Sequence, residues 1–428
     1  MRRVAAVGMA AALAAGLIAI AASAAGGVID PGGAARGAPP VPEQPRLGDI
    51  IFFPAGTNED GYELWRTDGT KAGTKQVVDI NDQAASSSPG DFARLGKRVL
   101  FNADDGDRGR ELWKTDGTAA GTKLVENIAP GSDASFPSDL YRFGDVILFR
   151  ADDGSNGDEL WRTDGTPQGT KLMKNIGPGS DDGYPYGFAR LGKHVYFGAN
   201  DGDTGYELWR TDGTRKGTKL FKDLAPNGTS TPTWMTRFRG RIYFSASDEN
   251  SDTEVWRTDG TKAGTKRFKD INDEGGSSSP GDFTPFGDLL LFRATTNDDG
   301  SELWRTNGTP QGTKQVEDIA DGSDDSQPGP IARLGPRALF FANDSDNDRE
   351  LWRTDGSGAG TKLLKDVRSG PSSSFGCGLV KIGDRLLFGA YTDDEGFELW
   401  RSDGTKPGTK LLQDIVLGSS GSNPFFCD

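Results

Sequence analysis

A short marker, Glu-Leu-Trp followed by Arg or Lys, recurs along the chain and constrains its fold more than any other feature. The marker tryptophans are Trp65, Trp113, Trp161, Trp209, Trp256, Trp304, Trp352 and Trp400. Successive copies are 48 residues apart, with one interval of 47. A fixed period of this size is typical of propellers, solenoids and repeat arrays. The sequence therefore predicts eight copies of one unit over residues 47–428.

Each unit has the pattern of four short β-strands. In the second unit these segments are 92–95, 98–103, 111–115 and 122–128. Gly96-Lys97 suits a type II′ hairpin between the first two, and Asp116-Gly117 suits a turn between the last two. Side chains alternate along a strand, so Leu112 and Trp113 lie on opposite faces and both faces must be covered.

Stacking such sheets around an axis covers both faces of each sheet. The sequence therefore predicts an all-β fold, an eight-bladed β-propeller with four antiparallel strands in each blade of about 48 residues. A linear β-solenoid is the competing interpretation, but it would need distinct capping units.

The two ends of the repeat favour closure of a ring. Only Pro45-Arg46-Leu47 precedes the hairpin of the first unit, whereas Pro424–Asp428 follows the last unit in phase with a further first strand. A C-terminal strand that completes the first blade would close the ring. The only two cysteines, Cys377 and Cys427, then predict a disulfide at this joint. Two unpaired thiols are the alternative.

The N-terminus has the pattern of an export signal. A basic Met1-Arg2-Arg3 precedes an apolar, Ala-rich run, and Ala22-Ser23-Ala24 fits a cleavage site, so residues 1–24 are predicted to be a signal peptide. A membrane anchor is the alternative. Residues 25–46, rich in Gly, Pro and Ala, are predicted to be a flexible linker. We therefore expect a secreted or extracytoplasmic protein, in the periplasm or at the cell surface, with no membrane span after cleavage.

The charge excludes one class of partner. The formal net charge is −14, whereas a general nucleic-acid binder needs a basic surface for phosphate contacts. We expect no nucleic-acid partner, and a monomer whose ligand is an unidentified protein or glycan.

The repeat resembles the ELWxxDGT repeat family of exported bacterial proteins. The matching stretch is 111–118, Glu-Leu-Trp-Lys-Thr-Asp-Gly-Thr, and it recurs in all eight units with small departures at Val255, Asn307 and Ser357. The resemblance covers about residues 47–428. It implies an extracytoplasmic, propeller-like repeat protein, and it implies no activity or ligand.

Residues that repeat in every unit are interpreted as scaffold. The eight marker tryptophans are predicted to be core anchors rather than ligand platforms. The Asp of the Asp-Gly-Thr stretch is predicted to cap the turn between strands three and four. A cation follows each Trp, and we expect these cations at the rim of one face, with the acidic loops on the opposite face.

Three acidic loops are the candidate metal sites. Their residues are Asp105, Asp107 and Glu111; Asp201, Asp203 and Glu207; and Asp344, Asp346 and Glu350. Carboxylate oxygens on a Gly-bearing loop suit Ca²⁺. No cofactor is required by the pattern. Solvated turns are the alternative to calcium sites.

Irregular aromatic residues in the loops between units are the candidate ligand contacts. These are Phe136, Tyr184, Tyr186, Trp234 and Phe375. Aromatic faces beside carboxylates suit a sugar or a cationic ligand. Packing within the loops is the alternative.

No catalytic residue is predicted. The single histidine, His194, falls within a strand, and Ser/His and Cys/His constellations are lacking. We therefore expect a non-enzymatic module that binds a protein or carbohydrate on its acidic, aromatic-bearing face. The alternatives are a carbohydrate-active enzyme that uses carboxylates in the channel, and a structural component of the cell surface or matrix.

Overall fold

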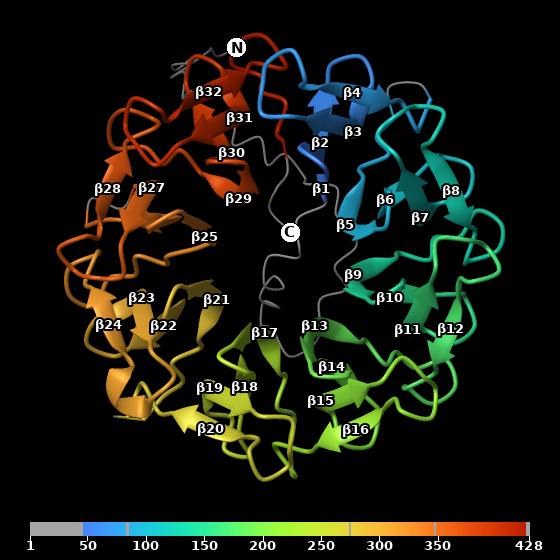
Figure 1. The fold of residues 1–428 in the computed structure, drawn as a ribbon, viewed down its shortest axis with the longest axis horizontal. Helices are drawn as coiled ribbons and strands as arrows, with labels where there is room; N and C mark the ends of the chain where they lie inside the picture. The colour runs from blue at the N-terminus through green and yellow to red at the C-terminus, as the bar shows by residue number, and fades with distance from the viewer. Residues whose placement is uncertain (1–45, 83–84, 274, 346–347, 425–428) are drawn as a thin grey trace, which may run out of the picture. The chain divides into compact units, whose positions relative to one another are not determined.

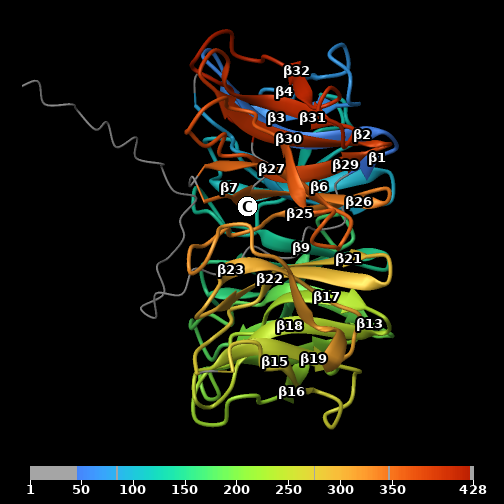
Figure 2. The ribbon, with the colours of Figure 1, turned by 90° about the vertical axis from the view of Figure 1, so that its left-hand side faces the viewer.

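The computed structural model describes residues 46–82, 85–273, 275–345 and 348–424. Their strands form eight separate four-stranded antiparallel sheets, arranged as the blades of an eight-bladed β-propeller (Figure 1). Within each blade the strands follow sequence order from the first strand, nearest the axis, to the fourth at the outside. From the side, the loops gather at the two faces of the ring (Figure 2). The predicted fold class is confirmed.

Blades 2, 3 and 4 have the same strand lengths, whereas blade 1 begins with a strand of only two residues. Blade 1 contains β1 (Arg46–Leu47), β2 (Ile50–Thr57), β3 (Gly61–Thr67) and β4 (Lys75–Val78). Blade 2 contains β5 (Gly90–Leu95), β6 (Arg98–Asp104), β7 (Arg110–Thr115) and β8 (Lys123–Glu126). Blade 3 contains β9 (Ser138–Phe143), β10 (Val146–Asp152), β11 (Asp158–Thr163) and β12 (Lys171–Lys174). Blade 4 contains β13 (Tyr186–Leu191), β14 (His194–Asn200), β15 (Tyr206–Thr211) and β16 (Lys219–Lys222).

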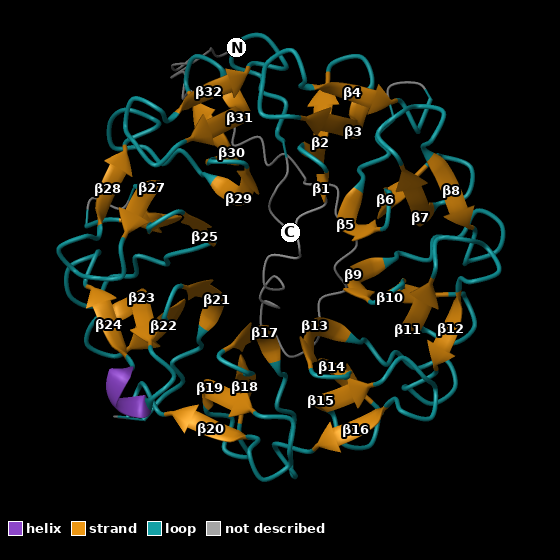
Figure 3. Cartoon of the chain, viewed as in Figure 1, coloured by secondary structure: helices purple, strands orange, loops and turns teal. Residues whose placement is uncertain are grey.

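The other four blades have the same order of four strands, and blade 6 adds one turn of 3₁₀ helix, η1 (Pro310–Gly312) (Figure 3). Blade 5 contains β17 (Thr233–Phe238), β18 (Arg241–Ser247), β19 (Thr253–Thr258) and β20 (Lys266–Lys269). Blade 6 contains β21 (Gly281–Phe286), β22 (Leu289–Thr296), β23 (Gly300–Thr306) and β24 (Lys314–Glu317). Blade 7 contains β25 (Ile331–Leu334), β26 (Arg337–Asn343), β27 (Arg349–Thr354) and β28 (Lys362–Lys365). Blade 8 contains β29 (Cys377–Ile382), β30 (Arg385–Thr392), β31 (Gly396–Ser402) and β32 (Lys410–Gln413).

The turn between strands three and four forms as predicted. In blade 1, the Asp68 Oδ1 accepts hydrogen bonds from the Thr70 N–H at 2.9 Å and from the Thr70 hydroxyl at 2.6 Å. These bonds span two residues, so the motif specifies its own turn. The fourth strand is shorter than predicted in blade 2, ending at Glu126 rather than Ile128. There the Ile128 N–H donates to the Glu111 carboxylate instead of to the sheet.

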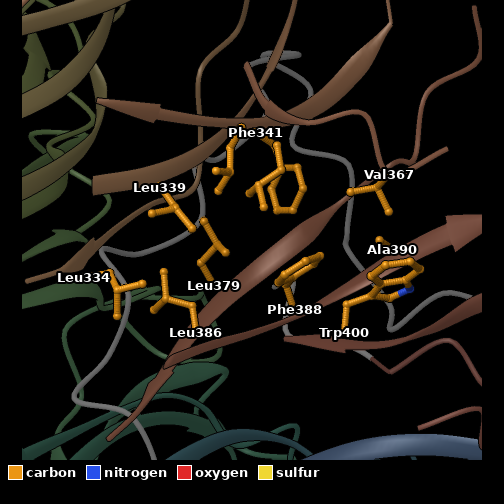
Figure 4. Packing of buried hydrophobic residues seen from close by; sticks show 11 residues of the cluster. Leu334, Leu339, Phe341, Val367, Leu379, Leu386, Phe388, Ala390 and Trp400 are labelled. Carbon is orange, nitrogen blue, oxygen red and sulfur yellow. The ribbon is translucent and has the colours of Figure 1, made fainter. Parts of the chain in front are cut away.

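The hydrophobic core lies between blades rather than within them. In one cluster, Phe341 and Val367 of blade 7 pack with Leu379, Phe388 and Trp400 of blade 8 (Figure 4). The marker Trp400 thus contributes its large apolar surface to the contact with the preceding blade. This placement agrees with the interpretation of the marker tryptophans as core anchors.

The cation that follows the marker Trp links its blade to the next one in blades 1, 2, 5, 6 and 8. Arg66 donates to the Gly117 carbonyl of blade 2 at 2.9 Å, and Lys114 donates to the Gly165 carbonyl of blade 3 at the same distance. From the sequence we expected these cations at the rim of one face and did not predict this contact. Their role as links between blades was missed because the partner carbonyl lies in the next blade.

Blade 8 contacts blade 1 in the same ways, which closes the ring. Arg401 donates to the Gly69 carbonyl at 3.4 Å. The Gly56 N–H donates to the Ser422 carbonyl at 2.9 Å, as the Asp104 N–H donates to the Ser87 carbonyl in blade 2. The C-terminal segment thus occupies the place of the loop that enters every other blade.

Two predictions about this joint and the termini fall outside the described residues. Cys377 opens β29, but Cys427 lies outside them, so the disulfide stays a prediction. The predicted signal peptide and nearly all of the predicted linker lie outside them too. In the described part, no helix has the length and apolarity that a membrane span requires.

Candidate functional site

The repeated glutamate of the marker is a structural anchor in every blade. Glu63 accepts hydrogen bonds from the Ile80 N–H at 2.8 Å, the Ser87 N–H at 2.8 Å and the Ser87 hydroxyl at 2.6 Å. It thereby holds the loop that leads to the next blade. The eight equivalents, each at most 1% exposed, are Glu63, Glu111, Glu159, Glu207, Glu254, Glu302, Glu350 and Glu398. Three of these were predicted to be calcium ligands: Glu111, Glu207 and Glu350.

Burial changes the acidity of these glutamates. Desolvation, only partly offset by the hydrogen bonds, raises the pKa of all eight. For Glu63, Glu159, Glu302 and Glu350 the pKa is raised to about 7. Because a repeated structural role explains the shift, it does not mark a catalytic acid here.

The aspartates of the acidic loops mainly close their own turns. Asp105 accepts from the Asp107 and Arg108 N–H groups at 3.1 and 2.9 Å, and it pairs with the Arg108 guanidinium at 2.5 Å. Asp201 accepts from the Asp203 and Thr204 N–H groups at 3.1 and 2.8 Å. Asp344 is described, whereas Asp346 lies outside the described residues.

The structure brings together a different set of carboxylates. Among the described residues, the groups that could hold a metal ion are Asp252, Glu254 and Asp270 in blade 5, and Asp348, Glu350 and Asp366 in blade 7. In each, ligand oxygens lie within 4.8 Å of one another. Only Glu350 belongs to the set predicted from sequence.

The two groups of carboxylates differ at one neighbouring position, which holds a cation in blade 5 and an apolar residue in blade 7. In blade 5, Arg267 pairs with Asp252 and, at 3.0 Å, with Asp270. In blade 7, Leu363 stands at the position of Arg267, each paired with the marker Trp of its blade. Blade 7 therefore offers three carboxylates without that cation.

Calcium binding stays a prediction, and these two blades test it. We expect millimolar Ca²⁺, relative to EDTA, to raise the melting temperature, because an ion that binds only the native state stabilises it. Asp366→Asn should reduce the shift and Asp270→Asn should leave it unchanged, since Asp270 is already paired with Arg267. A melting temperature that does not respond to Ca²⁺ would mean that these carboxylates are solvated turns.

A second group of polar side chains is held near the axis by β-bulges. The first strand carries a register shift in six blades, and one residue at each shift has a positive φ. These bulge residues are Asp91, Asp139, Gly187, Trp234, Asp282 and Gly378. Positive φ is uncommon outside glycine, and such outliers gather at functional sites. A bulge also re-aims its side chain.

In blades 2 to 4 the bulge residues link one blade to the next. The Asp91 Oδ1 accepts from the Asp139 N–H at 3.1 Å, and the Asp139 Oδ1 accepts from the Gly187 N–H at 3.3 Å. Asp91 also accepts from the Asn102 amide at 3.0 Å. The carboxylates of Asp91 and Asp139 therefore serve the contacts within and between blades.

The neighbouring arginines of blades 2 and 3 are equally well satisfied. Arg110 donates to the Ser88 carbonyl at 2.6 Å and to Asn102 at 2.7 Å. Arg150 donates to the Ser138 hydroxyl at 2.9 Å and lies 5.3 Å from the centre of the Tyr184 ring. Both stabilise this side of the ring.

The same positions in blades 6 and 7 hold a less satisfied cluster, formed by Asp282, Arg293 and Arg349. The Asp282 Oδ2 and the Arg293 Nη2 are 3.9 Å apart. Arg349 donates to the Gln327 carbonyl at 2.8 Å and to the Gly329 carbonyl. We call these three residues the blade 6–7 cluster.

The predicted aromatic residues occupy two different kinds of position. Phe136, Tyr184 and Phe375 stand at one repeat position, just before the first strand, all with positive φ. Phe136 and Phe375 are 49% and 60% exposed. Tyr186 is buried in β13 with its ring centre 6.0 Å from that of Tyr206, whereas Trp234 is a bulge residue. The five predicted aromatic residues therefore lie in or just before several different blades around the ring and do not form one cluster.

Sequence reasoning missed the charged residues near the axis. Arg293 and Arg150 each follow a phenylalanine of the second strand, where other units have Asn102, Gly198, Ser245, Phe341 or Gly389. A position-by-position comparison of the eight units would have found them, because they break a pattern that is otherwise uncharged.

The described residues provide no hydrolytic centre of the Ser–His type. His194 lies in β14, and among the described residues no hydrogen bond joins it to a serine or cysteine. Burial and the nearby Arg210 and Lys193 lower its pKa.

Comparison with solved structures shows a fold shared with propeller-containing peptidases. A puromycin-hydrolysing peptidase of Mycobacterium tuberculosis matches with 12% identity and a TM-score of 0.50, over 76% of this chain and 52% of that one. A prolyl endopeptidase matches with 15% identity and a TM-score of 0.48, over 81% and 53%. The chain thus spans about half the length of these peptidases. No protein-family model matches the sequence, and no curated protein sequence matches it either.

These comparisons correct the functional expectation. The hypothesis of a non-enzymatic module that binds protein or carbohydrate on its acidic face is contradicted, because the solved propeller that matches with a TM-score of 0.50 belongs to a puromycin-hydrolysing peptidase. Its structural basis is also weakened, since Asp105 and Asp201 close turns and Glu111 and Glu207 anchor loops. At identities this low, the likeness itself shows the fold alone.

Proposed function

We propose that this propeller is the substrate-selecting part of a peptidase-type system. The first strand of each blade lies nearest the axis and begins at the face that carries the acidic loops. The propeller receives peptide chains at this face and presents them to a hydrolytic centre on another domain or subunit. The peptidases that share the fold motivate this proposal. Its support within the molecule is the bulge residues and the aromatic side chains beside them.

The chemistry of that end suits a peptide. A peptide offers amide groups, charged termini and side chains of several kinds, so its receptor needs aromatic and charged groups on the same end of the molecule. Phe136 and Phe375 are exposed there, and Trp234, Asp282 and Arg293 lie on or beside the bulges. Backbone held at positive φ keeps such side chains in a defined direction.

The described residues support a separation of peptide selection from bond cleavage. They contain no hydrogen-bonded Ser–His pair, and the chain spans about half of the peptidases that it matches. We therefore place the bond-cleaving step outside the described residues and selection within them.

Retention of peptides on the immobilised chain tests the proposal. We expect short peptides from a casein digest to be retained, and cellohexaose not to be. The double variant Phe136→Asn/Phe375→Asn should retain several-fold less peptide, because it removes two exposed aromatic faces. Asn423 stands at the same repeat position with a φ of 42°, so asparagine fits this backbone.

Two controls make the result decisive. Melting curves should show that the double variant stays folded, and mass spectrometry of the unbound peptides should show no new cleavage products. Retention of cellohexaose instead of peptides would contradict the proposal, and peptide cleavage by the chain alone would contradict its second half.

A further inference from the structure

The blade 6–7 cluster differs from its counterpart in blades 2 and 3 in how its hydrogen bonds are satisfied. Asp91 and Asp139 each accept from the N–H of the residue 48 positions later. The residue 48 positions after Asp282 is Pro330, which has no N–H. Among the described residues, the Asp282 carboxylate accepts no hydrogen bond; its ion-pair contact is with Arg293 at 3.9 Å, and Arg349 lies near enough to interact with its charge.

Arg293 is likewise left with free donors. Arg150, at the same repeat position, has a hydrogen bond to Ser138 and a stacked tyrosine. Arg293 donates no hydrogen bond to any described residue, and its side chain is 31% exposed. A guanidinium carries five N–H donors in a planar fork. This one is therefore available to a ligand.

The cluster also carries an excess of positive charge. Two arginines, Arg293 and Arg349, surround the single carboxylate of Asp282. Burial lowers the pKa of Arg349 to about 10 although Asp282 opposes the change, and the nearby Arg293 adds to the lowering. Bound negative charge would relieve this repulsion, and the site is unusual in a chain whose net charge is −14.

We propose that Arg293 binds the terminal carboxylate of a peptide, with the nearby Arg349 adding positive charge and Trp234 beside the fork. This inference rests on the proposed function and names the feature of the peptide that is recognised. A guanidinium pairs with a carboxylate through two parallel N–H···O bonds, which gives direction as well as energy. The 12% exposed Asp282 lies 3.9 Å from Arg293, and its single carboxylate cannot neutralise both cations.

Trp234 provides an apolar surface next to the arginine fork. It lies in blade 5, and Gly281 of blade 6 lies between it and Arg293. A Cβ on Gly281 would lie 3.2 Å from the Trp234 Nε1 and 3.1 Å from the Arg293 Nη2. The absence of a side chain at Gly281 thus allows the indole and the guanidinium to approach. The last side chain of the peptide would contact the indole while its carboxylate meets the fork.

The test compares two forms of one peptide mixture on the immobilised full chain. The probes are random pentapeptides with either a free C-terminal carboxylate or a C-terminal amide, quantified by mass spectrometry. We expect the free acids to be retained at least tenfold more than the amides. Arg293→Ala should reduce this ratio below threefold, and Arg293→Lys should restore it only in part, because lysine keeps the charge and loses the fork.

Arg94→Ala is the matched control. Arg94 is an exposed arginine at the opposite, hairpin end of an inner strand, where it donates to the Gly96 carbonyl at 3.1 Å. Its removal changes the net charge by the same amount, and the ratio should stay above tenfold. A loss of preference in both variants would mean a general charge effect and would overturn the carboxylate site.

The remaining outcomes separate this inference from the proposed function. Equal retention of acids and amides would overturn the carboxylate site while peptide selection stands. Retention of neither form would overturn both. If retention depends on acidic side chains and not on the C-terminus, acids and amides will be retained equally and a mixture lacking Asp and Glu will not be retained, so the terminal assignment fails.

Discussion

Raising the pH from 5 to 8 is expected to lower the melting temperature of this protein by at least about 5 °C. The cause is the set of eight buried glutamates, whose pKa is raised by desolvation, to about 7 in four of them. A carboxyl whose pKa is higher in the folded state than in the unfolded state favours folding at low pH. That contribution is complete below pH 4.5 and is lost as the pH rises through about 7.

The magnitude follows from the shift. A glutamate whose pKa moves from 4.5 to about 7 loses roughly 2 kcal/mol of folding free energy between pH 5 and pH 8. The turn aspartates act in the opposite sense, since the hydrogen bonds from Thr70 lower the pKa of Asp68. Their contribution is present above pH 4 and is lost below it. Stability should therefore be greatest near pH 4.5 to 5.

Melting curves recorded between pH 5 and pH 8 measure this change in melting temperature. The matched variant is Glu302→Gln, which keeps one acceptor oxygen for the Ala320 and Ser326 N–H groups, loses the acceptor of the Ile319 N–H, and cannot titrate. Its melting temperature should fall less steeply with pH than that of the wild type. A melting temperature that stays level or rises between pH 5 and 8 would mean that these glutamates remain ionised in the fold.

The second large effect is expected where the ring closes. Glu398 accepts from the N–H groups of Ile415, Val416 and Ser422, and Ser422 in turn contacts Gly56 of blade 1. Glu398→Ala leaves these buried donors without a partner and should cost roughly 3 kcal/mol or more. It should also release the C-terminal segment, because no peptide bond joins blade 8 to blade 1.

Glu302→Ala is the control, since it removes the same kind of anchor inside the chain. There the loop at 319–326 stays covalently tied to β25, so the two variants should lose similar stability and differ in local opening. Limited proteolysis under reducing conditions should cut Glu398→Ala near residues 418–424 at least tenfold faster than Glu302→Ala within 319–326. Equal rates would show that the closing joint is no weaker than the others. Protection without reductant would support the predicted disulfide.

The sequence alone was enough to predict the architecture. The marker interval sets the number of blades, and the Asp68 turn is formed by bonds that span two residues. Alternation of Leu112 and Trp113 requires cover on both faces, which blades around an axis provide. Such features are local or strictly periodic, so each can be recognised without knowing what lies far along the chain.

The tertiary structure alone decided which residues form the site and which belong to the scaffold. Glu111 looked like a calcium ligand from its neighbours in sequence, but its partners lie 17 to 24 residues away and bury it. The carboxylate of Asp282 and the guanidinium group of Arg293 meet through strand pairing in blade 6, and Arg349 joins them because blade 7 packs beside blade 6 near the axis. Burial and contact between distant segments set the charge and reactivity of these groups, and neither can be computed from spacing along one chain.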